Sequence, residues 1–324
     1  MLDNQFPKPN VVVSKCLGFE ACNYNGHQFN NKFISMLKQF VNFIPVCPET
    51  AIGLPSPRQS LRLIADGDEV RLVQPAEDRD LTGDMLSFSH DFLNSLNDVE
   101  GFILKERSPS CGLKDIKIYH KEINNVTGKK TSGLFAGAVL ATFPDTAIES
   151  EGRLTNLRIR EHFLTRLFTL ARFRETKKQQ TMGGLVNFQT INKFLFMAYN
   201  QKEMRILGKI AANNEKLPVS EVFKKYEKHL NKLLSRPPRY NSNINVLMHG
   251  LGYFSDELTT EEKAFFLDTL QKFRNKKVPL SVPQNIIRSW AIKYKDDYLL
   301  KQTYFAPFPE ELIARTDSGT PKNF

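Results

Sequence analysis

The chain has 324 residues, of which 41% are hydrophobic and 25% charged; this excludes a wholly disordered chain and is long enough for two domains. Its net charge of +10 is divided unevenly. Residues 1–150 carry 15 Lys and Arg against 18 Asp and Glu (−3), whereas residues 151–324 carry 30 against 17 (+13). All four cysteines lie in the first part. We therefore expect chemistry and polyanion binding in different domains.

The expected compartment follows from two features that the sequence lacks. The N-terminal residues have no long apolar stretch of the kind found in a signal peptide. No run approaches the roughly 18 consecutive apolar residues of a membrane span. We therefore expect a cytoplasmic protein that does not contact a membrane and whose thiols are reduced. The sequence leaves its oligomeric state open.

The first part of the chain alternates short apolar runs with helical stretches. Three runs are predicted strands: 11–13, 40–46 and 99–104. Two stretches between them have helical spacing: 28–40 and 81–97. This alternation predicts a Rossmann-like α/β domain with a parallel sheet. A cysteine follows each predicted strand, so we expect Cys16, Cys47 and Cys111 at the sheet edge where ligands bind.

From residue 157 onward the pattern is helical and amphipathic. Apolar stripes cover 159–171 and 188–198, and further helices are expected at 219–234, 259–275, 283–294 and 309–314. The predicted domains are an α/β domain over residues 1–154 and a mostly α-helical, basic domain over residues 155–324.

The spacing of the cysteines alone leaves two interpretations. Cys16 and Cys22 are separated by five residues, which is not the C-x-x-C of many metal sites. Buried cysteines often act as small hydrophobic residues. However, a Pro-Glu pair follows Cys47 and Ser-Pro-Ser precedes Cys111, and such polar loops suit thiolates that point at a shared ion or cluster.

Three stretches of the first part resemble the thiouracil desulfidase (TudS-like) family of iron–sulfur enzymes: SKCLGFEACNYNG (14–26), IPVCPETAIGLPSPR (44–58) and GFILKERSPSCG (101–112). GLFAGAVLATFPDTAIESEGRL (133–154) is similar to the segment that closes that domain. Residues 185–212, 243–267, 278–290 and 298–312 resemble the helical domain often fused to it. The combination of both domains resembles tRNA 4-thiouridine desulfidases.

The resemblance implies a [4Fe-4S] cluster held by Cys16, Cys47 and Cys111, with one iron not ligated by protein. Cys22 is the fourth cysteine, and its role is left open. A soft thiocarbonyl sulfur is a suitable ligand for an open iron. Attack of water on the ring carbon would then give uridine and hydrogen sulfide.

Such a reaction needs a proton acceptor near the attacking water. Glu49, two residues after Cys47, is the expected base, unless it only caps a helix or binds loop amides. Ser108 and Ser110 are the other catalytic candidates, unless they only shape their loop. Lys105 and Arg58 are candidates for neutralising a substrate phosphate or the charge of a cluster, unless they are solvated surface residues.

The basic part carries a dense run of cations that predicts contact with RNA. The candidate RNA-binding residues are Arg153, Arg158, Arg160, Arg166, Arg172, Arg174, Lys177 and Lys178. Tyrosines that could stack on bases are Tyr199, Tyr240, Tyr253 and Tyr294. The expected partner is thiolated tRNA, whose target base would have to leave the stack.

Three functions are compatible with these features. The first is a cluster-dependent desulfidase acting on 4-thiouridine in tRNA. The second keeps the chemistry but acts on free thiouracil or thionucleosides. The third is a non-catalytic, metal-containing RNA-binding protein.

Overall fold

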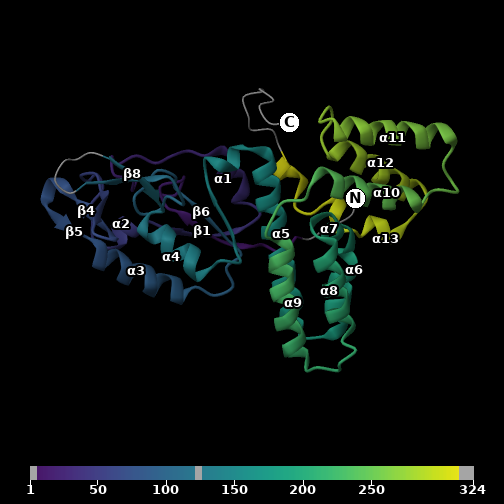
Figure 1. The fold of residues 1–324 in the computed structure, drawn as a ribbon, viewed down its shortest axis with the longest axis horizontal. Helices are drawn as coiled ribbons and strands as arrows, with labels where there is room; N and C mark the ends of the chain where they lie inside the picture. Colours follow the sequence, from purple (N-terminus) through teal and green to yellow (C-terminus); the bar gives the residue numbers. More distant parts are fainter. Residues whose placement is uncertain (1–5, 121–125, 314–324) are drawn as a thin grey trace. The chain divides into compact units, whose positions relative to one another are not determined.

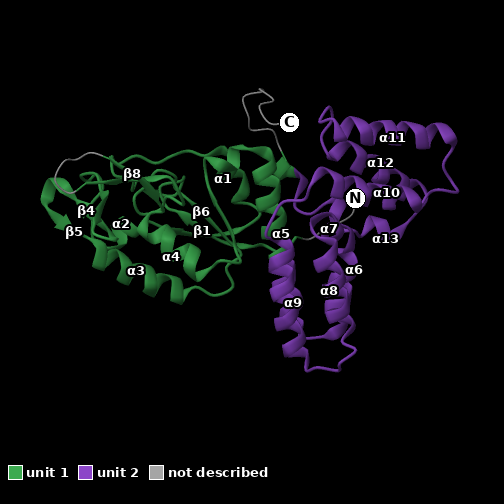
Figure 2. Ribbon diagram, in the orientation of Figure 1, with its two compact units in different colours: residues 1–171, 311–318 green, residues 172–310, 319–324 purple. Residues whose placement is uncertain are grey.

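The computed structural model describes residues 6–120 and 126–313 (Figure 1). These residues form two compact units (Figure 2). Among the described residues, unit 1 comprises 6–171 and 311–313, and unit 2 comprises 172–310. The division falls within helix α5 (Leu157–Gln179). The fold class is the predicted one: an α/β region followed by helices.

Unit 1 is built on a four-stranded parallel sheet, sheet A. Its strands are β1 (Asn10–Ser14), β2 (Asn42–Val46), β6 (Gly101–Leu104) and β9 (Ala147–Ser150). Their order is β2-β1-β6-β9, and every pair is parallel. The chain thus moves from β1 to β2 on one side and later to β6 on the other. Such a reversal of strand order is where ligands bind in open α/β sheets.

Helices cover both faces of sheet A. Val12 of β1 and Phe102 of β6 belong to the core against which α3 (Thr82–Ser95) and α4 (Leu134–Thr142) pack. On the other face, Gly101 lies under the first half of α5. A Cβ at Gly101 would be 2.7 Å from Leu167 Cδ1, so the absence of a side chain lets α5 approach the sheet. The remaining helices of this unit are α1 (Lys32–Leu37) and α2 (Pro48–Ala51).

A second sheet, sheet B, was not predicted. Its strands are β3 (Arg62–Asp66), β4 (Glu69–Gln74), β5 (Arg79–Asp80), β7 (Ile116–Tyr119) and β8 (Val126–Thr131). Their order is β5-β4-β3-β7-β8; β3 and β7 are parallel and the other pairs antiparallel. Leu63 and Leu72 are fully buried in the same core as Val12, so both sheets share one interior.

Unit 2 is entirely helical within its described residues. Its helices are the end of α5, α6 (Met182–Ile191), α7 (Lys193–Tyr199), α8 (Gln201–Ala212), α9 (Val219–Leu234), α10 (Tyr240–Gly252), α11 (Thr260–Arg274), α12 (Ser281–Lys293) and α13 (Asp297–Leu300). Short 3₁₀ turns in the chain are η1 (Pro75–Glu77), η2 (Arg153–Thr155), η3 (Thr303–Phe305) and η4 (Glu310–Ile313). Figure 1 shows α8 and α9 running side by side as a long hairpin.

The structure corrects three predicted helices. The stretch 28–40 is helical only over α1, because Asn31 caps its start by accepting a hydrogen bond from Ile34 N at 3.1 Å. The stripe over 188–198 is broken at Asn192 into α6 and α7. The buried Gln302 side chain bridges the break: its amide donates to Thr190 O (2.9 Å) and its carbonyl oxygen accepts from Phe194 N (3.0 Å). Of the stretch 309–314, residues 310–313 form η4 and residue 314 lies outside the described residues.

Candidate active site

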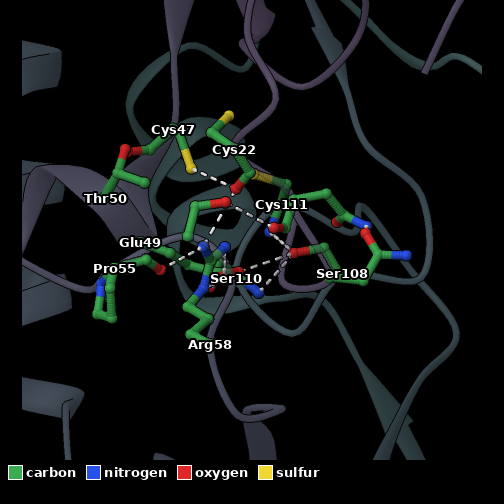
Figure 3. Close-up of polar contacts among 12 residues, drawn as sticks. Cys22, Cys47, Glu49, Thr50, Pro55, Arg58, Ser108, Ser110 and Cys111 are labelled. Atoms are coloured by element: carbon green, nitrogen blue, oxygen red, sulfur yellow. Dashed lines mark hydrogen bonds and ion pairs between the residues drawn. The ribbon is translucent and has the colours of Figure 1, made fainter. Parts of the chain in front are cut away.

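Three cysteine-bearing loops meet at the carboxyl edge of sheet A. Cys16 lies two residues after β1, and Cys47 follows β2 directly as the N-cap of α2. Cys111 lies in the loop after β6. Because these strands are neighbours in the order β2-β1-β6, the sheet brings the loops together, as the sequence predicts. Cys22 is also present: Cys47 Sγ lies 3.8 Å from Cys22 O (Figure 3).

The thiols influence one another electrostatically. Burial, together with the charge of Cys47, raises the pKa of Cys16 to about 12. Burial also raises the pKa of Cys111, with Glu49, Cys47 and Cys16 acting in the same direction. The hydrogen bond from the Cys22 thiol lowers the pKa of Cys47 to about 6. Cys16, Cys47 and Cys111 therefore lie close enough for the charge of one thiolate to raise the pKa of another.

Glu49 and Arg58 form a buried ion pair beside these cysteines. Their side chains are 10% and 3% exposed. Arg58 Nε donates to Glu49 Oε2 at 2.8 Å, and Nη2 donates to the same oxygen. Arg58 Nη1 donates to Cys22 O and to Pro55 O, both at 3.1 Å. The predicted alternative of a solvated Arg58 is therefore wrong.

The other oxygen of Glu49 contacts the loop that carries Cys111. Ser110, which has no exposed surface, donates to Glu49 Oε1 at 2.9 Å, and the Ser108 hydroxyl lies 3.4 Å from the same atom. The Glu49–Arg58 pair thus joins the loop of Cys22, the helix after Cys47 and the loop of Cys111 (Figure 3). We call this pair the Glu49–Arg58 bracket.

The two predicted serines differ in their contacts. Ser108 Oγ accepts hydrogen bonds from the amides of Ser110 (3.2 Å) and Cys111 (3.0 Å), which shapes the turn that presents the Cys111 thiol. Ser110 instead directs its hydroxyl at Glu49. The structure therefore brings Glu49, Ser108 and Ser110 together, while their catalytic roles remain predictions.

A second ion pair lies at the same edge of sheet A. Lys105 follows β6, and its Nζ pairs with Glu151, which follows β9. The Lys105 amide donates to Ser14 Oγ at 2.9 Å, and the Ser14 side chain also forms a hydrogen bond with Cys111. The Lys105 ammonium lies 4.8 Å from the centre of the Phe29 ring. This cation reduces the negative charge of the cysteine cluster and lowers the pKa of Cys16.

The donor set at this edge of sheet A consists of thiols. Cys16, Cys47 and Cys111 come from three adjacent strand ends, and thiolates are the usual ligands of Fe–S clusters. These three residues therefore suit an iron–sulfur cluster.

The eight cations predicted to bind RNA differ in their surroundings. In unit 1, Arg158 is exposed, but Arg160 is 2% exposed and donates to Leu154 O at 2.7 Å. Arg153 pairs with Glu149 at 2.7 Å, and Arg166 donates to Asp145 O at 3.2 Å. In unit 2, Arg172 donates to Pro307 O, Arg174 and Lys178 pair with Glu175, and Lys177 pairs with Glu227. The Arg160 side chain is thus buried and holds the backbone around Leu154, whereas Arg158 and Lys178 are exposed to solvent.

Two family matches divide the chain. Residues 11–151 match the 2-thiouracil desulfurase family. This segment holds both sheets, all four cysteines and the Glu49–Arg58 bracket. Residues 193–309, in unit 2, match the family described as "Protein of unknown function (DUF1722)".

Individual relatives cover about half of the chain. The protein YbgA of Escherichia coli (strain K12) is 29% identical over 154 residues, 47% of this chain and 91% of YbgA. The protein YbbK of Bacillus subtilis (strain 168) is 29% identical over 154 residues, 45% of this chain and 99% of YbbK. Among solved structures, the [4Fe-4S]-dependent thiouracil desulfidase TudS is 26% identical, with a TM-score of 0.36, and covers 45% of this chain and 93% of its own. No helix within the described ranges has both the length and the apolar character to cross a membrane.

Proposed function

We propose that the chain is a desulfidase that removes sulfur from 4-thiouridine in tRNA and releases it as hydrogen sulfide. The match of residues 11–151 to the 2-thiouracil desulfurase family supports the desulfidase chemistry. The observation that carries the proposal is the convergence of three cysteine loops on one buried carboxylate, Glu49. The basic composition of residues 151–324 supports a nucleic-acid substrate.

Cys16, Cys47 and Cys111 would hold a [4Fe-4S] cluster, the kind of cofactor on which TudS depends. When bound through three cysteines, such a cluster supplies a Lewis-acidic iron that lacks a protein ligand and suits a soft sulfur. Lys105 and Arg58 place cationic groups near the cysteines, each paired with a carboxylate, Glu151 and Glu49 respectively. Cys22 accepts a hydrogen bond from Arg58 through its backbone carbonyl, and we propose that its thiol supports Cys47 and is not a ligand of the cluster.

Glu49 is the proposed proton acceptor for the attacking water. Its Oε2 is held by Arg58, and Ser110 fixes the direction of Oε1. The Ser108 contact to Oε1 is long at 3.4 Å, so this side of the carboxylate can accept a hydrogen bond from water. Water adds its oxygen to the ring carbon as the C=S bond breaks, so thiouridine and water give uridine and hydrogen sulfide.

The test uses the full chain, reconstituted anaerobically with iron and sulfide. We expect a broad absorbance near about 400 nm, and sulfide release from thiolated tRNA with oxygen from labelled water entering the base. Alanine at Cys16, Cys47 or Cys111 should abolish turnover, whereas Cys22→Ala, the matched control, should retain it. Full activity in any of the first three variants would refute the assignment of that cysteine as a cluster ligand.

Free thiouracil is the second candidate substrate, because the matched family is described by that compound. Salt distinguishes the two substrates. Phosphate contacts make RNA binding fall steeply with ionic strength, while a small neutral base is insensitive to it. Activity on tRNA should therefore drop between 50 and 200 mM salt, by at least about tenfold, with little change on 2-thiouracil. Tight RNA binding without any sulfide release would instead favour a non-catalytic RNA-binding protein.

A further inference from the structure

Unit 2 contains a hollow of about 460 Å³ that is remote in sequence from the cysteine loops. Its lining residues are Gln189, Thr190, Lys193, Gly208, Tyr253 and Tyr298. They come from the break between α6 and α7, from α8, from the end of α10 and from α13. A hollow of this size lies within the range of about 300–1,000 Å³ that small-molecule sites occupy.

One wall of the hollow is a fixed aromatic surface. The rings of Tyr253 and Tyr298 are stacked, with centroids 5.7 Å apart and planes 16° apart. Behind them, the buried Phe194 ring contacts both, edge-on, at 6.1 and 6.3 Å. Tyr253 is 44% exposed even though it is packed on two rings. Such a supported, open aromatic face is what a planar ring can stack on.

Cations lie at and near the hollow. Lys193 is exposed and has no ion-pair partner among residues 6–120 and 126–313. Arg205, three residues before Gly208 on α8, is exposed and likewise lacks an acidic partner in those ranges. None of the six lining residues is acidic. Burial raises the pKa of Tyr298 to about 12, so this phenol stays neutral at physiological pH. The hollow therefore attracts a negatively charged ligand.

The floor of the hollow offers hydrogen-bonding groups in a fixed setting. The Gln189 side-chain carbonyl accepts from Tyr226 at 2.6 Å, while its amide has only a long 3.5 Å contact with Met204 O. Thr190 donates to Val186 O at 2.8 Å, which leaves its hydroxyl oxygen as an acceptor. The buried Gln302 holds the backbone of this break on both sides. A donor and an acceptor thus line the same hollow as the two tyrosines.

We propose that this hollow binds one unstacked nucleotide of an RNA, with its base on Tyr253 and Tyr298 and its phosphate at Lys193. An aromatic platform, an unpaired cation and edge-reading polar groups together are how proteins hold single nucleotides of loops and ends. The proposal deepens the RNA side of the proposed function and does not require the cysteine chemistry. The ligand class is RNA rather than a peptide, because the rim is cationic and the wall is flat.

The test measures binding of an unmodified, fluorescently labelled tRNA transcript to the full chain at fixed salt. Tyr253→Ala should weaken binding by at least about tenfold, the loss typical of one stacked base, while Tyr253→Phe should keep nearly all of it. Gly208→Leu should also weaken binding, because a Cβ there would meet Gln189 Nε2 at 3.8 Å and the longer side chain would fill the hollow. Phe265→Ala removes a 61% exposed ring of α11 and serves as the matched control.

Two further readouts separate this proposal from the proposed function. Photocrosslinking of an RNA that contains 5-iodouridine should label Tyr253 or Tyr298. Turnover of free 4-thiouridine should be the same in Tyr253→Ala and in the unaltered chain. Equal RNA affinity in Tyr253→Ala, Gly208→Leu and the unaltered chain would overturn the nucleotide site, whether or not sulfide is released. If the unaltered chain binds RNA through these tyrosines but releases no sulfide from any thiolated substrate, only the desulfidase proposal is refuted.

Discussion

Replacing Arg58 by methionine tests the Glu49–Arg58 bracket directly. The guanidinium is 3% exposed and donates to Glu49 and to the carbonyls of Cys22 and Pro55. Arg58→Met leaves a carboxylate that is 10% exposed without its countercharge, and removes the arginine donor from two carbonyls. Breaking a buried ion pair on one side costs about 3–5 kcal/mol. We therefore expect the free energy of unfolding of unit 1 to fall by about that amount.

The same substitution at Arg71 is the matched control. Arg71 lies on β4 in the same unit and pairs with Asp66 (2.6 Å) and Asp80 (3.3 Å), but its side chain is 46% exposed. Exposed pairs contribute about 0–1 kcal/mol, so Arg71→Met should have a small effect. The double variant Glu49→Gln/Arg58→Met removes both buried charges and should recover part of the stability that Arg58→Met loses.

The measurement is urea denaturation of the metal-free full chain, with hydrogen exchange to localise the change. Exchange should accelerate in residues 44–58 and 101–112 in Arg58→Met, because these segments carry the loops that the bracket joins. If Arg58→Met is no more destabilising than Arg71→Met, the bracket does not hold the loops and the reasoning fails.

Three further changes have defined outcomes. Ser110→Ala leaves Glu49 Oε1 without the hydroxyl that donates to it at 2.9 Å. This variant should lower kcat at least about tenfold with little change in KM. An unaltered kcat would show that Ser110 has no part in the mechanism. Gly101→Ala places a Cβ 2.7 Å from a leucine of α5 and should destabilise unit 1 by about 1–3 kcal/mol. The control Gly83→Ala adds a Cβ with nothing within 4 Å and should not destabilise the unit. Equal melting temperatures for the two variants would contradict this packing. Burial opposes ionisation of Glu203, but hydrogen bonds from Lys232 and His229 hold its pKa below the usual 4.5. The stabilisation from Glu203 is therefore present above that pH and is lost as the pH falls through the lower folded value. Glu203→Gln should therefore flatten the acid side of the stability curve, and an unchanged acid transition would show that Glu203 does not contribute.

The parts of the fold that depend on local pattern were predictable. The apolar run at 11–13 is the centre of β1, and the predicted helix 219–234 has the bounds of α9. Sheet B was missed although its signal is present: two short runs rich in apolar residues, which contain the buried Leu63 and Leu72, lie on either side of Gly67-Asp68. Gly-Asp between two such runs is a hairpin signal, and Gly67 has the positive φ of +62° that such a turn requires.

The candidate site was predictable only in outline. The position of the cysteines after three strands follows from the sequence, because parallel strands end at one edge. The pairing of Arg58 with Glu49 does not follow from the sequence, because a separation of nine residues does not indicate that the arginine side chain is buried. The same holds for Gln302, which closes the break at Asn192 from more than 100 residues away. Long-range polar partners of this kind are set by packing rather than by local pattern.

The Glu49–Arg58 bracket has a consequence for how the protein matures. The bracket consists of hydrogen bonds and an ion pair between protein groups, so it joins the cysteine loops without requiring a metal. Small domains whose metal is their core fold only on loading. For this protein we expect folding to be separable from the loading of a cofactor. A chelator should then abolish the activity of the loaded protein without unfolding it.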